Sequence, residues 1–203
     1  MNLSEVYRRS AAEFVELVGG ASAGQLATVV PACPAWTVHD LLAHLAGSSA
    51  DVVSGNLDGV TTSPWTARQV ADRRGRTTQE LVAEWRSHAE QVAAVCDSTA
   101  GPNPAWDVAV HLADLREGLG LPPGPAENGW GEVRDAAVGL LARDGSGVSV
   151  QEHALDPGTT SWHFATSYGL WRAVFSRLDR TLLEREILRG DVDAFAAVAF
   201  LGD

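Results

Sequence analysis

Residues 33–47 read CPAWTVHDLLAHLAG, a stretch that holds both the start of a helix and part of its apolar face. Thr37 is a favourable N-cap residue, and Asp40 three positions later forms an Asp variant of the capping box. The apolar residues that follow recur at helical spacing as Val38, Leu41, Leu42, Leu45, Val52 and Val53. Since Gly55 ends this pattern, the stretch predicts an amphipathic helix between Thr37 and Gly55.

Three further segments of the first half show the same periodicity. The first covers residues 3–18 and stops at Gly19-Gly20, and the next covers about 77–97. The last covers about 105–118 and is introduced by two prolines. Residues 56–76 are polar and contain Gly and Pro, so we expect a connection without regular structure there. Four amphipathic helices with one apolar stripe each predict a four-helix bundle.

The second half of the chain has a different character. Residues 120–125, GLPPGP, are typical of a linker. Short apolar or alternating runs follow, and we expect strands at residues 136–142, 148–153 and 162–165. Two further helices are expected at about 168–178 and 192–201. The sequence therefore predicts an α+β protein, with a four-helix bundle over residues 1–121 and a small α+β domain over 126–203.

The composition excludes several classes of protein. All 15 basic residues are arginine, so a Schiff-base lysine, a pyridoxal phosphate anchor and a P-loop lysine are ruled out. The formal net charge of −11 argues against binding to nucleic acid or to anionic membranes. No apolar run could cross a bilayer, the N-terminus does not resemble a signal peptide, and two cysteines are too few for a disulfide framework. We therefore expect a cytoplasmic protein.

Asp107, His111 and Asp114 form a polar line on the helix expected at residues 105–118. They lie about one turn apart and flank the apolar stripe of that helix. A partly buried line of such residues is costly unless it pairs or binds a metal ion. His44 lies at the edge of the stripe of its own helix. Because bundles build metal sites from facing helices, His44, Asp107 and His111 predict a site with three protein ligands and open positions.

Other interpretations of the histidines stay open. An Asp-x-x-x-His pair also occurs on helices as a local ion pair with a satisfied histidine. His88 lies near the centre of an apolar stripe, and we interpret it as a hydrogen-bonded core residue; it becomes the first alternative ligand if the metal site lies elsewhere. His39 is expected to be solvated, and no role is assigned to His153 or His163.

Cys33 precedes the N-terminus of a helix, where a thiolate could be stabilised. It has no basic neighbour in sequence, so we interpret it as a structural cysteine that packs under Trp36. The sequence contains no Gly-x-Ser-x-Gly, Cys-x-x-Cys, Gly-x-Gly-x-x-Gly or His-Glu-x-x-His pattern.

Residues 33–47 resemble the C-P-G-W-T-V-x-D-L-x-x-H-L-x-G segment of mycothiol-dependent maleylpyruvate isomerase-like proteins. HLADLR at 111–116, followed by GLGLP at 118–122, is similar to the second signature of that family, H-x-x-D-L-R with a downstream G-L-P. Residues 170–177 and Gly190-Asp191 are similar to its C-terminal domain. The resemblance implies a DinB-like four-helix N-terminal domain and a small, sterol-carrier-like C-terminal domain.

The resemblance also implies a divalent metal, usually zinc, held by the histidine of the first motif and a Glu-x-x-x-His pair. Those positions fall on His44, Asp107 and His111. Asp107 stands where the family usually has Glu, and Ala35 replaces the usual Gly. The cosubstrate implied is mycothiol, and Arg116 is a residue that an anionic thiol cofactor could use.

These features predict a metal-dependent transferase or isomerase that acts on a small electrophile through a metal-bound thiolate. Two alternatives stay open at the level of the sequence. One is a non-catalytic module that binds a small molecule or a protein partner on the same bundle. The other is a metal-dependent hydrolase, because water and thiol need the same open coordination position.

Overall fold

The computed structural model describes residues 2–98, 103–141, 148–150 and 162–199. The chain divides into two compact units, residues 1–129 and 130–203. The first unit extends beyond Leu121, where the sequence places the end of the bundle. The turn η1 (Ala126–Asn128) belongs to it, because Asn128 donates from its side-chain amide to Glu13 at 2.9 Å and accepts from Ser10 through its carbonyl oxygen at 3.4 Å.

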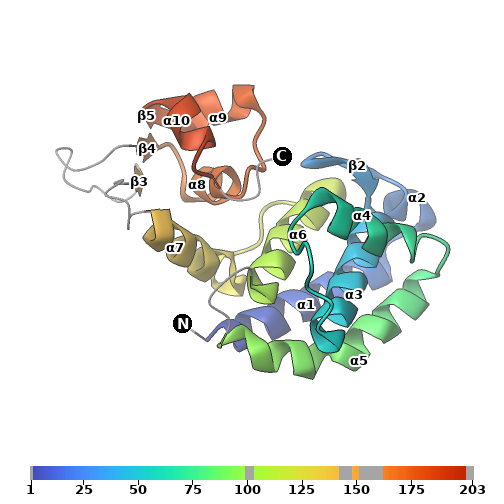
Figure 1. Cartoon of the computed structure of the whole chain (residues 1–203). Coiled ribbons are helices and arrows are strands. Elements are labelled where there is room, and N and C mark those ends of the chain that lie inside the picture. The colour runs from blue at the N-terminus through green and yellow to red at the C-terminus, as the bar shows by residue number, and fades with distance from the viewer. Residues whose placement is uncertain (1, 99–102, 142–147, 151–161, 200–203) are drawn as a thin grey trace. The chain divides into compact units, whose positions relative to one another are not determined.

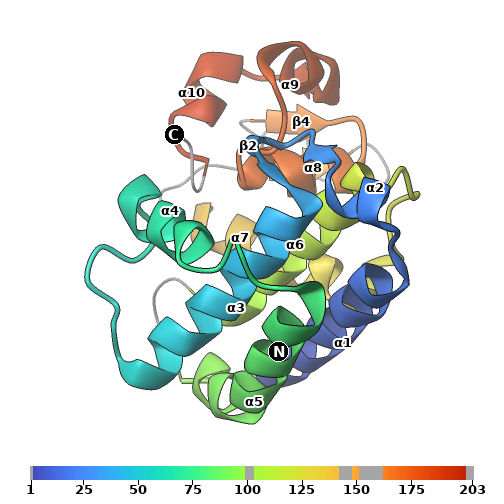
Figure 2. The ribbon, with the colours of Figure 1, turned by 90° about the vertical axis from the view of Figure 1, so that its right-hand side faces the viewer.

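The first unit is the predicted four-helix bundle. Its helices are α1 (Leu3–Gly20), α3 (Val38–Ser54), α5 (Thr78–Cys96) and α6 (Pro104–Gly118). Helix α1 packs on α5 and α6, and α3 packs on the same two helices, so the four enclose a common core (Figure 1). Helix α6 lies alongside both α1 and α3 (Figure 2).

The ends of α3 confirm the signals in the sequence. The Thr37 hydroxyl accepts from the Asp40 backbone N–H at 3.1 Å, and the Asp40 carboxylate accepts from the Thr37 N–H at 3.0 Å, which completes the capping box. Gly55 ends the helix in the left-handed conformation, with φ 74°. Thr77 caps α5 through an equivalent box with Glu80.

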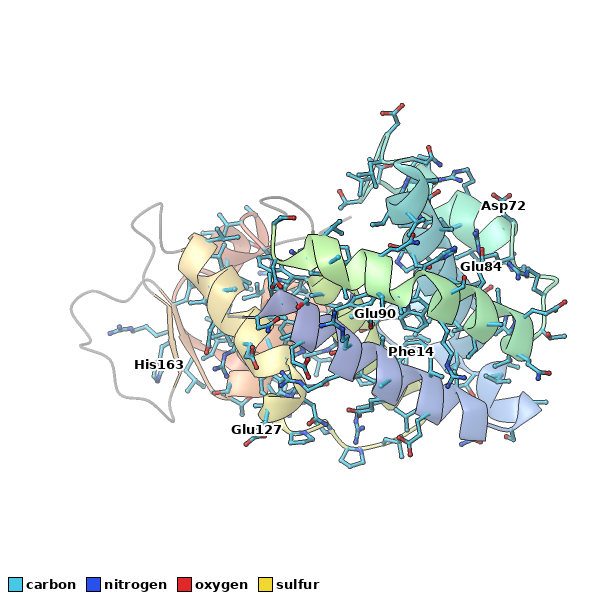
Figure 3. All side chains as sticks on the ribbon, turned by 90° about the horizontal axis from the view of Figure 1, so that it is seen from below. Phe14, Asp72, Glu84, Glu90, Glu127 and His163 are labelled. Atoms are coloured by element: carbon cyan, nitrogen blue, oxygen red, sulfur yellow. The ribbon has the colours of Figure 1, made fainter. Side chains whose placement is uncertain are left out.

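Aromatic side chains fill the centre of the bundle. Phe14, labelled on α1 in Figure 3, is buried. It packs edge to face on the buried Trp85 of α5, with ring centroids 5.4 Å apart. The Trp85 indole N–H donates to the Tyr7 hydroxyl at 2.8 Å, which satisfies a buried donor. Helix α5 packs on both α3 and α6, the two helices that carry residues of the candidate site.

Residues 56–76 contain a helix that the sequence prediction missed. Helix α4 (Ser63–Ala71) packs on α3 and buries Trp65, Gln69 and Val70. Its polar composition concealed it, because only one side of a short helix is buried. Three smaller elements before α3 were also not expected: α2 (Ala23–Leu26), β1 (Val29–Val30) and β2 (Cys33–Thr37), of which the two strands pair antiparallel.

The second unit combines helices with a small sheet, so the α+β class is confirmed. Strands β3 (Val148–Val150), β4 (Trp162–Phe164) and β5 (Ile187–Arg189) form the sheet in that order, with β3 parallel and β5 antiparallel to β4. Trp162 and Phe164 of β4 pack on Phe195, with ring centroids 5.4 and 4.9 Å apart.

The prediction of a strand at residues 136–142 was wrong. Residues 136–141 belong to helix α7 (Trp130–Leu141), whose buried residues Val133, Ala137 and Leu141 recur every four positions. The apolar run alone suggested a strand, whereas the helical period becomes visible only when the preceding turn is included. The remaining helices are α8 (Ser167–Val174), α9 (Arg180–Glu186) and α10 (Val192–Ala196), and α9 was not expected.

Part of the strand predicted at 148–153, His153 itself and the last residues of the helix predicted at 192–201 lie outside the described residues. Each helix within residues 2–98, 103–141 and 162–199 is too short or too polar to span a lipid bilayer.

Candidate metal centre

His44, Asp107 and His111 meet between two helices of the bundle. His44 lies on α3, and the other two residues lie one turn apart on α6. The Nε2 atoms of His44 and His111 are each 3.5 Å from Oδ1 of Asp107. One ligand atom from each residue lies within 4.8 Å of the others. The structure therefore brings together the three residues that the sequence proposed as ligands.

The two imidazoles are buried, whereas the carboxylate between them reaches solvent. The side chains of His44 and His111 are 2% and 5% exposed, and that of Asp107 is 28% exposed. Trp36 of β2 packs on both imidazoles, with ring centroids 5.0 Å from His44 and 5.9 Å from His111. The site is thus closed on the side of the imidazoles and open at Asp107.

Asp107 carries a negative charge at neutral pH. Burial by itself would raise the pKa of Asp107, but the positive charge of His44 in its protonated form, a hydrogen bond from that ring, the charge of protonated His111 and a hydrogen bond from Ser48 outweigh it and lower the pKa to about 2. The Ser48 hydroxyl donates to Oδ2 at 3.3 Å, which leaves Oδ1 facing the two imidazoles. A cavity of about 10 Å³ lies beside Asp107 and is also lined by Ser48, Ser49 and Tyr7. Its volume is close to the minimum that one water molecule needs.

Asp114 fixes the orientation of His111. Its fully buried carboxylate lies 2.9 Å from Nδ1 of His111. Because an ionised carboxylate only accepts hydrogen bonds, Nδ1 is the donor, and the lone pair of the neutral ring lies on Nε2, facing Asp107. Burial lowers the pKa of His111, which favours this neutral form.

The other ring nitrogen of His44 contacts a residue that sequence reasoning missed. Nδ1 of His44 lies 2.8 Å from Oε1 of Gln69, a fully buried residue of α4. Trp65, one turn earlier, meets the His44 ring edge to face at 6.4 Å. Trp65 and Gln69 are four residues apart, a spacing that is typical of one face of a helix. They lie within residues 56–76, which we expected to form a connection without regular structure.

The donor set and its spacing fit a divalent metal ion. Ligand atoms about 2.1 Å from a tetrahedral zinc ion lie about 3.4 Å from one another, and the two His–Asp separations here are 3.5 Å. Two imidazole nitrogens and one carboxylate oxygen are also a ligand set that catalytic zinc sites use. An ionised carboxylate facing lone pairs on imidazole nitrogens is electrostatically unfavourable unless a cation, either a proton or a metal ion, lies between them.

Cys33 has polar neighbours that its sequence does not show. Its thiol donates to Oδ2 of Asp114 at 3.6 Å, and Cys33, His111 and Asp114 form a second group of closely spaced ligand atoms. Both neighbours come from α6, more than seventy residues away along the chain. The interpretation of Cys33 as a structural residue stays a prediction.

Arg116 lies in the last turn of α6 and is held by the first unit itself. Its guanidinium pairs with Glu13 of α1 and donates to the carbonyl oxygen of Pro122 at 2.9 Å. These contacts join α6 to α1 and to the segment that follows. A role for Arg116 in binding a thiol cofactor stays a prediction.

His88 and His39 form hydrogen bonds with residues other than the three proposed ligands. His88 is half-buried and not in the core as expected, but its Nδ1 contacts the Ser49 hydroxyl at 3.1 Å, in agreement with the expected hydrogen bond. His39 is half-buried and not solvated as expected, because its Nε2 donates to the carbonyl oxygen of Arg76 at 2.9 Å.

The comparison with known families identifies the family of the first unit. The sequence model of the mycothiol maleylpyruvate isomerase N-terminal domain matches residues 7–122, more than half of the chain. The chain belongs to this family. No curated protein and no solved structure matches the chain significantly. All three candidate ligands and the segment 33–47 lie within the part that the mycothiol maleylpyruvate isomerase family matches, whereas the second unit lies outside it. A sterol-carrier-like second domain therefore stays a prediction.

Proposed function

We propose that this protein is a metal-dependent thiol enzyme that uses mycothiol as its cosubstrate. In this proposal His44, Asp107 and His111 hold one divalent cation, with zinc the best match to the ligand set. The observation that carries the proposal is the convergence of two Nε2 atoms on one carboxylate oxygen at 3.5 Å. Membership of a mycothiol-linked family supports mycothiol as the thiol.

The residues around the site have distinct tasks in this proposal. A bound cation would lower the pKa of a thiol and so supply a thiolate at neutral pH. Asp107 contributes the negative charge that attracts the cation, and Ser48 holds its second oxygen. Asp114 keeps the Nε2 lone pair of His111 directed at the site. Trp36 covers both imidazoles, which limits access of water from that side.

The exposed side of Asp107 is where substrates would approach. Three protein ligands leave at least one coordination position open, as in catalytic rather than structural zinc sites. The reaction proposed is the addition of a thiolate to an electrophilic carbon of a small molecule. The resulting anion either takes up the proton that the thiol lost and leaves as a thioether, which is S-transfer, or expels the thiolate again and leaves as an isomer of the starting molecule.

A conjugation screen tests this proposal. The zinc-loaded protein is incubated with a panel of small electrophiles, with mycothiol, with another low-molecular-weight thiol, or with no thiol, and loss of free thiol and formation of product are followed. We expect turnover that requires mycothiol and disappears in His111→Ala. Turnover that needs water but no thiol would instead identify a hydrolase and contradict the proposal.

A further inference from the structure

We propose that Gln69 is a positioning residue for the candidate metal centre, because it fixes the proton of His44 on Nδ1. The inference deepens the proposed function and rests on it for its purpose, but the position of the proton can be tested separately. The sequence prediction missed Gln69, since it lies in α4, within the segment expected to lack regular structure.

The orientation of the Gln69 amide follows from its neighbour on α3. Its Nε2 donates to Oδ2 of Asp51 at 2.6 Å. Asp51 also accepts from Arg68 at 2.8 Å and from the side chain of Asn56 at 2.9 Å. A carboxylate only accepts hydrogen bonds, so the amide nitrogen of Gln69 must face Asp51. A rotated amide would place its oxygen against a carboxylate oxygen.

The amide orientation decides the tautomer of His44. With Nε2 of Gln69 committed to Asp51, Oε1 faces Nδ1 of His44 at 2.8 Å. An amide oxygen only accepts, so Nδ1 must be the donor. A neutral imidazole has one ring proton, and its lone pair therefore lies on Nε2, the atom 3.5 Å from Asp107. The opposite tautomer would aim an N–H at the metal position and could not bind the ion.

Burial makes this arrangement selective. Gln69 is 0% exposed and His44 is 1% exposed, so water does not replace either partner. A buried donor or acceptor without a partner is unfavourable, and every rotated alternative creates one. His111 is held in the same tautomer by Asp114, so the two imidazoles present equivalent nitrogens through two different acceptors.

Gly47 is the residue that lets Gln69 reach His44. A Cβ atom at Gly47 would lie 2.6 Å from Cβ and 2.9 Å from Cγ of Gln69. Real Cβ contacts do not come that close, so any larger residue at position 47 would push α4 away from α3. The close approach of α3 and α4 at Gly47 thus permits the hydrogen bond between Gln69 and His44.

The test uses the full-length chain and two measurements. Long-range ¹H–¹⁵N spectra of the metal-free protein at alkaline pH, where imidazoles are neutral, report which ring nitrogen carries the proton. Competition with a chromophoric chelator reports zinc affinity. We expect the proton of His44 on Nδ1 in the unsubstituted protein, and a zinc affinity about 10- to 100-fold lower in Gln69→Leu. Gly47→Ala should lower the affinity in the same direction, and it serves as the second variant if Gln69→Leu does not fold.

Val70→Ala is the matched control, because Val70 is a buried neighbour on the same helix. It should leave zinc affinity within a few-fold of the unsubstituted protein. The inference is overturned if the proton of His44 lies on Nε2, if Gln69→Leu binds zinc as tightly as the unsubstituted protein, or if Val70→Ala loses as much affinity as Gln69→Leu. If the unsubstituted protein binds no zinc but carries the proton on Nδ1, the proposed function fails and the positioning by Gln69 stands.

Discussion

The imidazole rings of His44 and His111 come from different helices, yet their centroids lie 4.9 Å apart with their planes at 79°. This edge-to-face arrangement allows both Nε2 atoms to lie 3.5 Å from the same oxygen of Asp107. In two stacked rings the Nε2 lone pairs would point along parallel lines and could not meet at one oxygen atom. The crossing of α3 and α6 in the bundle is therefore what turns two distant histidines into one candidate site.

Asp107→Asn should weaken metal binding without unfolding the bundle. The change keeps the shape of the side chain but removes the charge that faces the two imidazoles. We expect zinc affinity to fall by at least about 10-fold, while the far-ultraviolet circular dichroism spectrum stays the same. Titration against a chelator of known affinity measures the change, and an unaltered affinity would show that Asp107 is not a ligand.

Cys33→Ser should keep thiol-transfer activity within a few-fold. The thiol contacts the carboxylate of Asp114, and a serine hydroxyl can donate to the same oxygen. Steady-state rates with mycothiol and a reactive electrophile provide the measurement, with Cys96→Ser as a control at a buried cysteine. A loss of several orders of magnitude with metal retained would make Cys33 a nucleophile and not a structural residue.

The metal-free protein should lose stability in mild acid because of His111. Burial lowers the pKa of His111 below 6.5, so the unfolded chain takes up a proton there at a higher pH than the folded protein does. A histidine with a lowered pKa therefore contributes to the free energy of unfolding in full above pH 6.5. This contribution is lost as the pH falls below 6.5.

Urea denaturation in the presence of a chelator measures this effect. The free energy of unfolding should decrease from about pH 7.5 to about pH 5.5, and less steeply in His111→Gln. Equal slopes for the two proteins would mean that His111 does not titrate as its burial implies.

The first unit alone should bind the metal. All three candidate ligands, together with Gln69, Asp51 and Asp114, lie within residues 1–129. A chain that ends at Gly129 should bind one equivalent of zinc with an affinity close to that of the full chain, as measured by isothermal titration calorimetry. If the shortened chain is soluble and helical but binds no zinc, the second unit supplies part of the site.

The sequence was informative where local chemistry decides the structure. The caps at Thr37 and Thr77 and the glycine at position 55 are local signals, and the observed helices begin and end at them. The helical spacing of Asp107 and His111 likewise places them on one face of α6 before any tertiary contact is known. Apolar stripes then require the helices to pack, which brings α3 and α6 together.

The parts that were missed depend on tertiary contacts. Gln69 is polar and sits in a polar segment, so only its pairing with His44 and Asp51 explains why it is buried. The neighbours of Cys33 come from α6, and local sequence could not reveal them. Helix α7 was missed for a different reason, since its apolar residues were considered without the turn that establishes their period.

The central claim is that His44, Asp107 and His111 bind one metal ion, and metal stoichiometry tests it most directly. The full-length protein and its His44→Ala and His111→Ala variants would be loaded with zinc, desalted and analysed by inductively coupled plasma mass spectrometry. Circular dichroism would confirm that all three keep their helices. We predict one equivalent of zinc in the unsubstituted protein and essentially none in either variant. One equivalent retained in both variants would contradict the account and move the search to the hydrogen-bonded His88.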